Sequence, residues 1–176
     1  MKRFLIVVDM QNDFVDGSLG TKEALAIIPA AAKKIEEFDG MAIATFDTHF
    51  ENYSETAEGK NLPVPHCIEG TEGWELNASI KAALDKKAWI PIKKLTFGSV
   101  DLPHIIAAYA YGDDFEIELI GLCTDICVVS NALMLKAAFP EKRIAVDAAC
   151  CAGVTPALHK AALDVMRSCQ IDVIDG

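Results

Sequence analysis

The sequence of 176 residues contains no apolar run that approaches the roughly 20 residues of a membrane-spanning helix. It is also poor in basic residues, with 16 lysines and arginines against 26 aspartates and glutamates, so its formal net charge is −10. A chain this acidic is not expected to bind nucleic acid or an anionic membrane surface. We therefore expect partners of another kind.

Three common sequence signatures are missing as well. The first apolar segment runs into Asp9-Met10-Gln11-Asn12-Asp13 and not into a glycine-rich turn, which speaks against a dinucleotide-binding domain. Cys123 and Cys127 are four residues apart, whereas a thioredoxin-like redox protein needs Cys-x-x-Cys. The six cysteines lack the spacing of a disulfide scaffold, and no small-residue cleavage site follows the apolar start. We expect reduced thiols in a cytoplasmic protein.

What the sequence does contain is an alternation of two kinds of segment. Short apolar segments, typical of strands buried on both faces of a parallel sheet, cover residues 3–8, 41–46, 88–92, 115–122, 143–146 and 171–174. Segments of helical period cover residues 22–38, 73–86, 102–111, 125–138 and 155–169. The alternation predicts a single α/β domain over residues 1–176, with a doubly wound, mainly parallel six-stranded sheet and helices on both faces.

Ligands of such sheets bind at the carboxyl ends of the strands, where Cys127 lies. The expected helix after residues 115–122 places Cys127 in its first turn, with Thr124 or Asp125 as the N-cap. The helix dipole would lower the pKa of the thiol there, and free backbone amides could form an oxyanion hole. A cysteine at this position can equally well pack against the sheet, so the local sequence leaves both roles open.

Two further strand ends supply groups that a nucleophilic cysteine needs. Asp9 comes directly after the first apolar segment and could accept the thiol proton. Lys93 and Lys94 come directly after the third apolar segment. At about 4 Å and an effective dielectric constant near 20, one cation stabilises a thiolate by roughly 4 kcal/mol, or about three pKa units. A lysine could therefore hold the negative charge that Asp9 and Cys127 share.

Three ordered segments resemble the isochorismatase-like cysteine hydrolases, which include the nicotinamidases. They are LIVVDMQNDF at residues 5–14, IKKLTFGS at residues 92–99 and GLCTDICV at residues 121–128. The resemblance implies a catalytic triad of Asp9, Lys94 and Cys127, because the family lysine lies three residues before an aromatic. It also implies a cis peptide bond between Leu122 and Cys123, and an oxyanion hole formed by the backbone N–H groups of Cys123 and Cys127.

The same resemblance implies a divalent metal ion. Asp47, His49 and His66 match an Asp-x-His pair and a later histidine that nicotinamidases use as ligands, and these residue types suit zinc, iron or manganese. Some relatives add a glutamate. Glu58 is the nearest match for it, and Glu55 is a competing choice.

The substrate implied by the resemblance is nicotinamide. Its hydrolysis is a step of NAD metabolism, in which Cys127 would form a thioester and ammonia would leave. Many nicotinamidases carry an aromatic residue shortly before the last metal histidine, and the segment Leu62-Pro63-Val64-Pro65-His66 has none. Phe14, Leu62 and Trp74 are the residues expected to line the pocket instead. Alternatives are another small amide, a carbamoyl, ureido or isochorismate-like substrate, or a catalytically silent binding protein on the same fold. The resemblance also implies a homo-oligomer.

Overall fold

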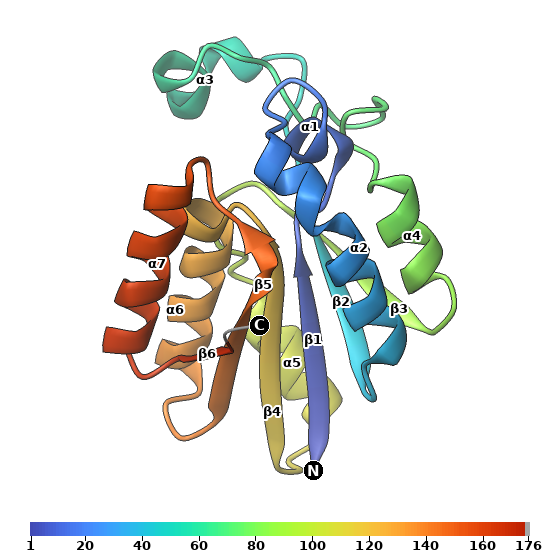
Figure 1. The fold of residues 1–176 in the computed structure, drawn as a ribbon, viewed down its shortest axis with the longest axis vertical. Helices are drawn as coiled ribbons and strands as arrows, with labels where there is room; N and C mark the ends of the chain where they lie inside the picture. Colours follow the sequence, from blue (N-terminus) through green and yellow to red (C-terminus); the bar gives the residue numbers. More distant parts are fainter. Residues whose placement is uncertain (175–176) are drawn as a thin grey trace.

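The computed structural model describes residues 1–174, and its centre is a six-stranded, all-parallel sheet (Figure 1). The strands are β1 (Lys2–Val8), β2 (Met41–Asp47), β3 (Trp89–Lys94), β4 (Phe115–Leu122), β5 (Arg143–Ala152) and β6 (Asp172–Ile174). Their order in the sheet is β3-β2-β1-β4-β5-β6. The chain therefore winds outward from β1 in both directions, which confirms the doubly wound sheet predicted from the sequence.

Helices cover both faces of the sheet (Figure 1). One face carries α2 (Lys22–Glu37) and α4 (Ala78–Leu84), and the other carries α5 (Leu102–Ala110), α6 (Val129–Ala138) and α7 (Pro156–Ser168). Side chains of β1 alternate between the two cores: Phe4 and Ile6 pack on one side, and Leu5 and Val7 on the other. In the described part of the chain, no helix is both long and apolar enough to cross a membrane.

The structure corrects the starts of two expected helices. Instead of beginning near residue 73, α4 begins at Ala78, because the side chain of Asn77 caps it by accepting a hydrogen bond from Ser79 N. The helix expected from residue 125 opens with a π-helical turn, η2 (Thr124–Val128), before α6 begins. In addition, β5 extends to Ala152, six residues beyond its expected end, because a register shift lets its last residues pair with the end of β4.

Short elements gather above the carboxyl ends of the strands (Figure 1). They are α1 (Asn12–Val15), the 3₁₀ helix η1 (Tyr53–Glu55) and α3 (Ala57–Asn61), the last two within the long connection after β2. Directly below them, β4 passes very close to β1. Gly121 has a φ of +122°, and a Cβ there would lie 2.1 Å from the carbonyl oxygen of Val8. Only glycine fits, and the close approach brings Asp9 next to the turn that carries Cys127.

Candidate active site

Cys127 lies in η2, where its side chain is buried at the base of a cavity. The expected side-chain cap is wrong, because the N-cap position is Cys123 and no side chain caps the turn. Ile126 N and Val128 N instead donate to the Cys123 carbonyl, each at 3.1 Å. The side chain of Thr124 pairs with His159 of α7 at 2.8 Å, and Asp125 accepts from Val154 N at 2.9 Å. These hydrogen bonds connect the η2 turn to α7 and to the loop before α7.

Asp9 follows β1 and Lys94 ends β3, on either side of β2, and both side chains reach the thiol. The Lys94 Nζ lies 2.7 Å from Asp9 Oδ2 and 3.5 Å from the Cys127 Sγ, so the structure brings the expected triad together. The other Asp9 oxygen accepts a hydrogen bond from the Thr45 hydroxyl at 2.6 Å. Asp9 is fully buried and has a φ of +47°, in the left-handed region where Asp occurs more often than most residues. Strained backbone of this kind is common at functional sites.

The pKa of Cys127 is shifted in the opposite direction to the one expected from the helix dipole. Burial raises the pKa of Cys127 well above its ordinary value, and the charge of Asp9 raises it further, while Lys94 opposes both. Burial also raises the pKa of Asp9, against the charge of Lys94. Burial alone would lower the pKa of Lys94, but Asp9, Cys127 and Asp47 together raise it. The triad therefore holds a protonated lysine beside an acid and a thiol that can exchange one proton.

The Leu122–Cys123 peptide bond is cis, as the resemblance implies. Cys123 and Cys127 line the same cavity. The oxyanion hole formed by their backbone N–H groups stays a prediction.

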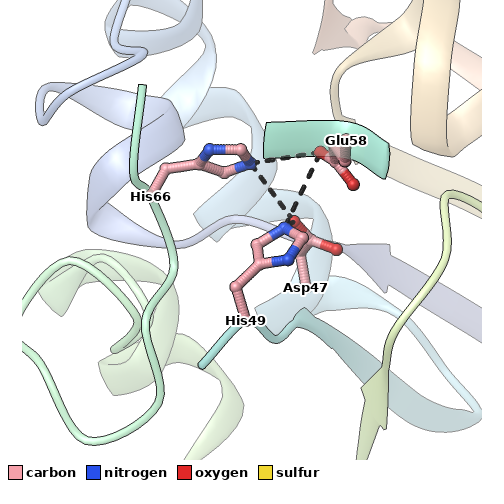
Figure 2. Close-up of side chains that lie close together, drawn as sticks. All are labelled: Asp47, His49, Glu58 and His66. Atoms are coloured by element: carbon pink, nitrogen blue, oxygen red, sulfur yellow. Dashed lines mark hydrogen bonds and ion pairs between the residues drawn. The ribbon is translucent and has the colours of Figure 1, made fainter. Parts of the chain in front are cut away.

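Four side chains next to the triad form a cluster with the donor set of a metal site: Asp47, His49, Glu58 and His66 (Figure 2). The His49 Nε2 lies 3.0 Å from Asp47 Oδ2 and 3.7 Å from Glu58 Oε1. The corresponding distances from the His66 Nε2 are 3.6 Å and 3.5 Å. Ligands placed tetrahedrally around zinc lie roughly 3.3 to 3.6 Å apart. The four distances are close to this range and all four ligand atoms lie within 4.8 Å of one another, so the cluster is compact enough to hold one ion. Of the two competing glutamates, Glu58 belongs to the cluster.

The electrostatics of the cluster also suit a cation. Burial by itself would raise the pKa of Asp47, but hydrogen bonds from His49 and His66 and the charge of Lys94 lower it far below its ordinary value. Burial by itself would lower the pKa of His66, but Asp47 and Glu58 raise it to about 10. Without a metal ion the carboxylates therefore favour a proton on the His66 imidazole, and a bound metal ion would replace that proton.

Three residues that the sequence left without a role hold these ligands in place. The Gln11 side-chain amide accepts from Asp47 N at 2.8 Å and donates to Asp47 O at 2.9 Å. The Tyr53 ring packs edge-on against His49 and His66, with centroids 4.8 and 5.2 Å away. Asp13 accepts a 2.7 Å hydrogen bond from the backbone N of residue 67, the neighbour of His66. Gln11 and Asp13 lie in the first family segment, which was their only signal in the sequence.

The cavity above the triad has a volume of about 710 Å³. Phe14 and Leu62 line it, as expected. Trp74 is not among its lining residues: its ring packs against Phe46 with centroids 5.2 Å apart, and its Nε1 donates to Thr48 at 3.0 Å. The remaining apolar lining residues were not predicted for the pocket: Leu95, Phe97 and Ile126 lie in the second and third family segments, whereas Leu19 and Ala57 lie outside the family segments.

Comparison with known proteins gives matches along nearly the whole chain. A family model described as Isochorismatase domain matches residues 3–176. The nicotinamidase/pyrazinamidase of Mycobacterium tuberculosis (strain ATCC 25618 / H37Rv) is 30% identical over 186 residues, which cover 98% of each chain. Similar solved structures include two amidases. A pyrazinamidase of Pyrococcus horikoshii in complex with zinc has a TM-score of 0.81 at 26% identity, with 100% of both chains covered. The N-carbamoylsarcosine amidase of Thermoplasma acidophilum has a TM-score of 0.76 at 27% identity, with 99% of this chain and 96% of that chain covered.

Proposed function

The chain belongs to the isochorismatase family, and on that premise we propose that it is a nicotinamidase-like cysteine amidohydrolase. It would convert nicotinamide and water to nicotinate and ammonia through a thioester on Cys127. One observation carries the proposal: a lysine ammonium lies between a buried carboxylate and a buried thiol, at the base of a cavity that also holds a metal-binding cluster. This is the arrangement that nucleophilic catalysis without a histidine base requires.

Each residue of the triad has a distinct task. Asp9 accepts the Sγ proton as Cys127 attacks the carboxamide carbon, and the positive charge of Lys94 keeps the combined negative charge of the pair favourable. The tetrahedral oxyanion would accept hydrogen bonds from the backbone N–H groups of Cys123 and Cys127. Asp9 then returns the proton to the nitrogen, the C–N bond breaks, and ammonia leaves.

Hydrolysis of the thioester repeats these steps with water as the nucleophile. Asp9 accepts a proton from the water as it attacks the acyl carbon. The C–S bond breaks, and the thiolate of Cys127 takes the proton back from Asp9. Nicotinic acid leaves and loses its carboxyl proton in solution, where the released ammonia takes up a proton to become ammonium. The sum of the two halves is one water consumed and one ammonia released, and the triad returns to its starting protonation state.

Asp47, His49, Glu58 and His66 would hold a divalent ion, with zinc as our first choice and iron or manganese as alternatives. Such an ion supplies a Lewis acid that orients the pyridine nitrogen and withdraws electrons from the ring. The hydrogen bond between His66 Nδ1 and the Val64 carbonyl, at 2.8 Å, leaves the His66 Nε2 lone pair directed at the cluster. The expected homo-oligomer and cytoplasmic location stay predictions.

Ammonia release from nicotinamide tests this function directly. The purified protein is assayed beside Cys127→Ala and beside a sample treated with a chelator and then resupplied with zinc. We expect turnover in the untreated protein, none in Cys127→Ala, and loss followed by recovery in the treated sample. Absence of ammonia from a zinc-loaded protein whose Cys127 reacts with iodoacetamide would refute the choice of substrate. An unreactive Cys127 would favour the silent binding protein instead.

A further inference from the structure

The two ends of the active-site cavity differ in exposure and in chemistry. Cys127 and the metal-binding cluster lie at the inner end, where they are mostly buried. Three large apolar side chains line the same cavity and are still well exposed: Leu62 at 38%, Leu95 at 64% and Phe97 at 47%. A residue that lines a cavity and also meets solvent lies at its mouth. We call these three residues the outer rim.

The cavity is larger than nicotinamide requires. Even if each of the about nine non-hydrogen atoms of nicotinamide took roughly 30 Å³, the volume of a water molecule in the liquid, the molecule would need about 270 Å³. The cavity offers about 710 Å³. More than half of the cavity would therefore stay open to water. Apolar side chains line this part, and contact with an apolar group of a ligand would remove their surface from water, which is favourable.

The charges of the cavity are unfavourable for an anion. Among the described residues that line it, the acids are Asp47 and Glu58, and none is a lysine or an arginine. The histidines that line it, His49 and His66, belong to the cluster at the inner end, where they pair with these two acids. The ammonium of Lys94 lies below, engaged by Asp9 and Asp47 at 2.7 and 3.1 Å. A carboxylate at the outer rim would lose part of its hydration without finding a cation.

The ring geometry of the substrate links these observations. This step rests on the proposed function, in which the ring nitrogen and the carboxamide both face the inner end. Ring carbon 5 is adjacent to neither the nitrogen nor the carbon that carries the carboxamide, so it points toward the mouth. We propose that Leu62, Leu95 and Phe97 form a specificity subsite that accepts aromatic amides with an apolar substituent at carbon 5 and rejects those with a carboxylate there.

Three amides test the subsite: nicotinamide, 5-methylnicotinamide and nicotinamide with a carboxylate at carbon 5. For the wild-type protein we expect the methyl group to lower KM by up to about fourfold, since about one methylene equivalent of apolar surface is buried. The carboxylate should lower kcat/KM by about a hundredfold or more. A tenfold loss of kcat/KM with the methyl group, or equal use of the carboxylated amide, would overturn the proposal.

A charge introduced at the rim provides the matched test. Leu95→Arg should raise kcat/KM for the carboxylated amide about tenfold relative to nicotinamide. Val100→Arg is the control, because Val100 is also 64% exposed but does not line the cavity. An equal response of the two variants would show that the rim does not contact the substituent.

Binding separates a failure of the subsite from a failure of the proposed function. If nicotinamide itself is not hydrolysed, the function fails, and the subsite is judged from the affinities of the three amides for Cys127→Ala. The methyl compound should bind at least as tightly as nicotinamide, and the carboxylated one at least tenfold more weakly. The reverse order would refute the subsite.

Discussion

Replacing Lys94 with methionine removes the cation of the triad and retains much of the volume of the side chain. In the structure the Nζ lies 3.5 Å from the Cys127 Sγ, and both side chains are buried. At this distance and an effective dielectric constant near 20, the attraction between ammonium and thiolate is about 5 kcal/mol. Each 1.4 kcal/mol corresponds to a factor of ten, so thioester formation should slow by about three to four decades.

The assay is the rate of thioester formation in a single turnover, with the alkylation of Cys127 by iodoacetamide as a measure that needs no substrate. Both rates should fall in Lys94→Met. Lys93→Met is the matched control, because Lys93 is the adjacent residue but is exposed and pairs with Glu69 at the surface. Retention of more than about a tenth of the wild-type rate in Lys94→Met would refute this account of the triad, as would an equal loss in Lys93→Met.

Three further outcomes follow from the geometry. Asn131→Leu removes the hydrogen bond that Asn131 donates to Cys127 O (2.8 Å) and the one it accepts from Ser99 N (2.9 Å). The free energy of unfolding, measured in urea, should therefore fall by about 1–3 kcal/mol, and an unchanged midpoint would contradict this. Gly121→Ala would place a Cβ 2.1 Å from Val8 O, so we expect a fall in Tm of several degrees or insoluble protein, and a wild-type Tm would show that the strands can separate. Chelation should abolish nicotinamide turnover while Cys127 can still be alkylated, and turnover that survives verified metal loss would refute the role of the cluster.

The sheet could be predicted from the sequence because strands buried on both faces are apolar throughout. The chain from Phe4 to Val8 is such a run within β1. The segment from Phe115 to Leu122 is apolar except for Glu116 and Glu118, and its bounds agree with those of β4. Helix starts depend on single capping contacts. The bond that starts α4 at Ala78 involves the side chain of Asn77, and no periodicity in the sequence reports it.

The residues of the candidate site also differ in whether the sequence could predict them. The residues expected in the catalytic triad, and Asp47 and His49 of the cluster, follow strand ends or occur in family segments. Glu58 and His66 lie in the long connection after β2 and were matched only through the resemblance. Trp74 was expected in the pocket because it is aromatic, but its backbone carbonyl accepts a 2.8 Å hydrogen bond from Gln11, and its ring faces Phe46. Contacts of this kind join residues more than 25 positions apart in the chain, and a single sequence does not reveal them.

The carboxylate of Asp47 belongs to two sites at once. Its Oδ1 lies 3.1 Å from the Lys94 Nζ, while its Oδ2 faces the two imidazoles of the metal-binding cluster. Occupancy of the candidate metal site and the reactivity of the thiol would therefore be thermodynamically linked through one side chain. Such linkage is reciprocal: if zinc changes the proton affinity of Cys127 by some factor, then protonation of Cys127 changes the affinity for zinc by the same factor. The pH dependence of zinc affinity in the wild-type protein, compared with that in Cys127→Ala, would measure that coupling from the side of the metal.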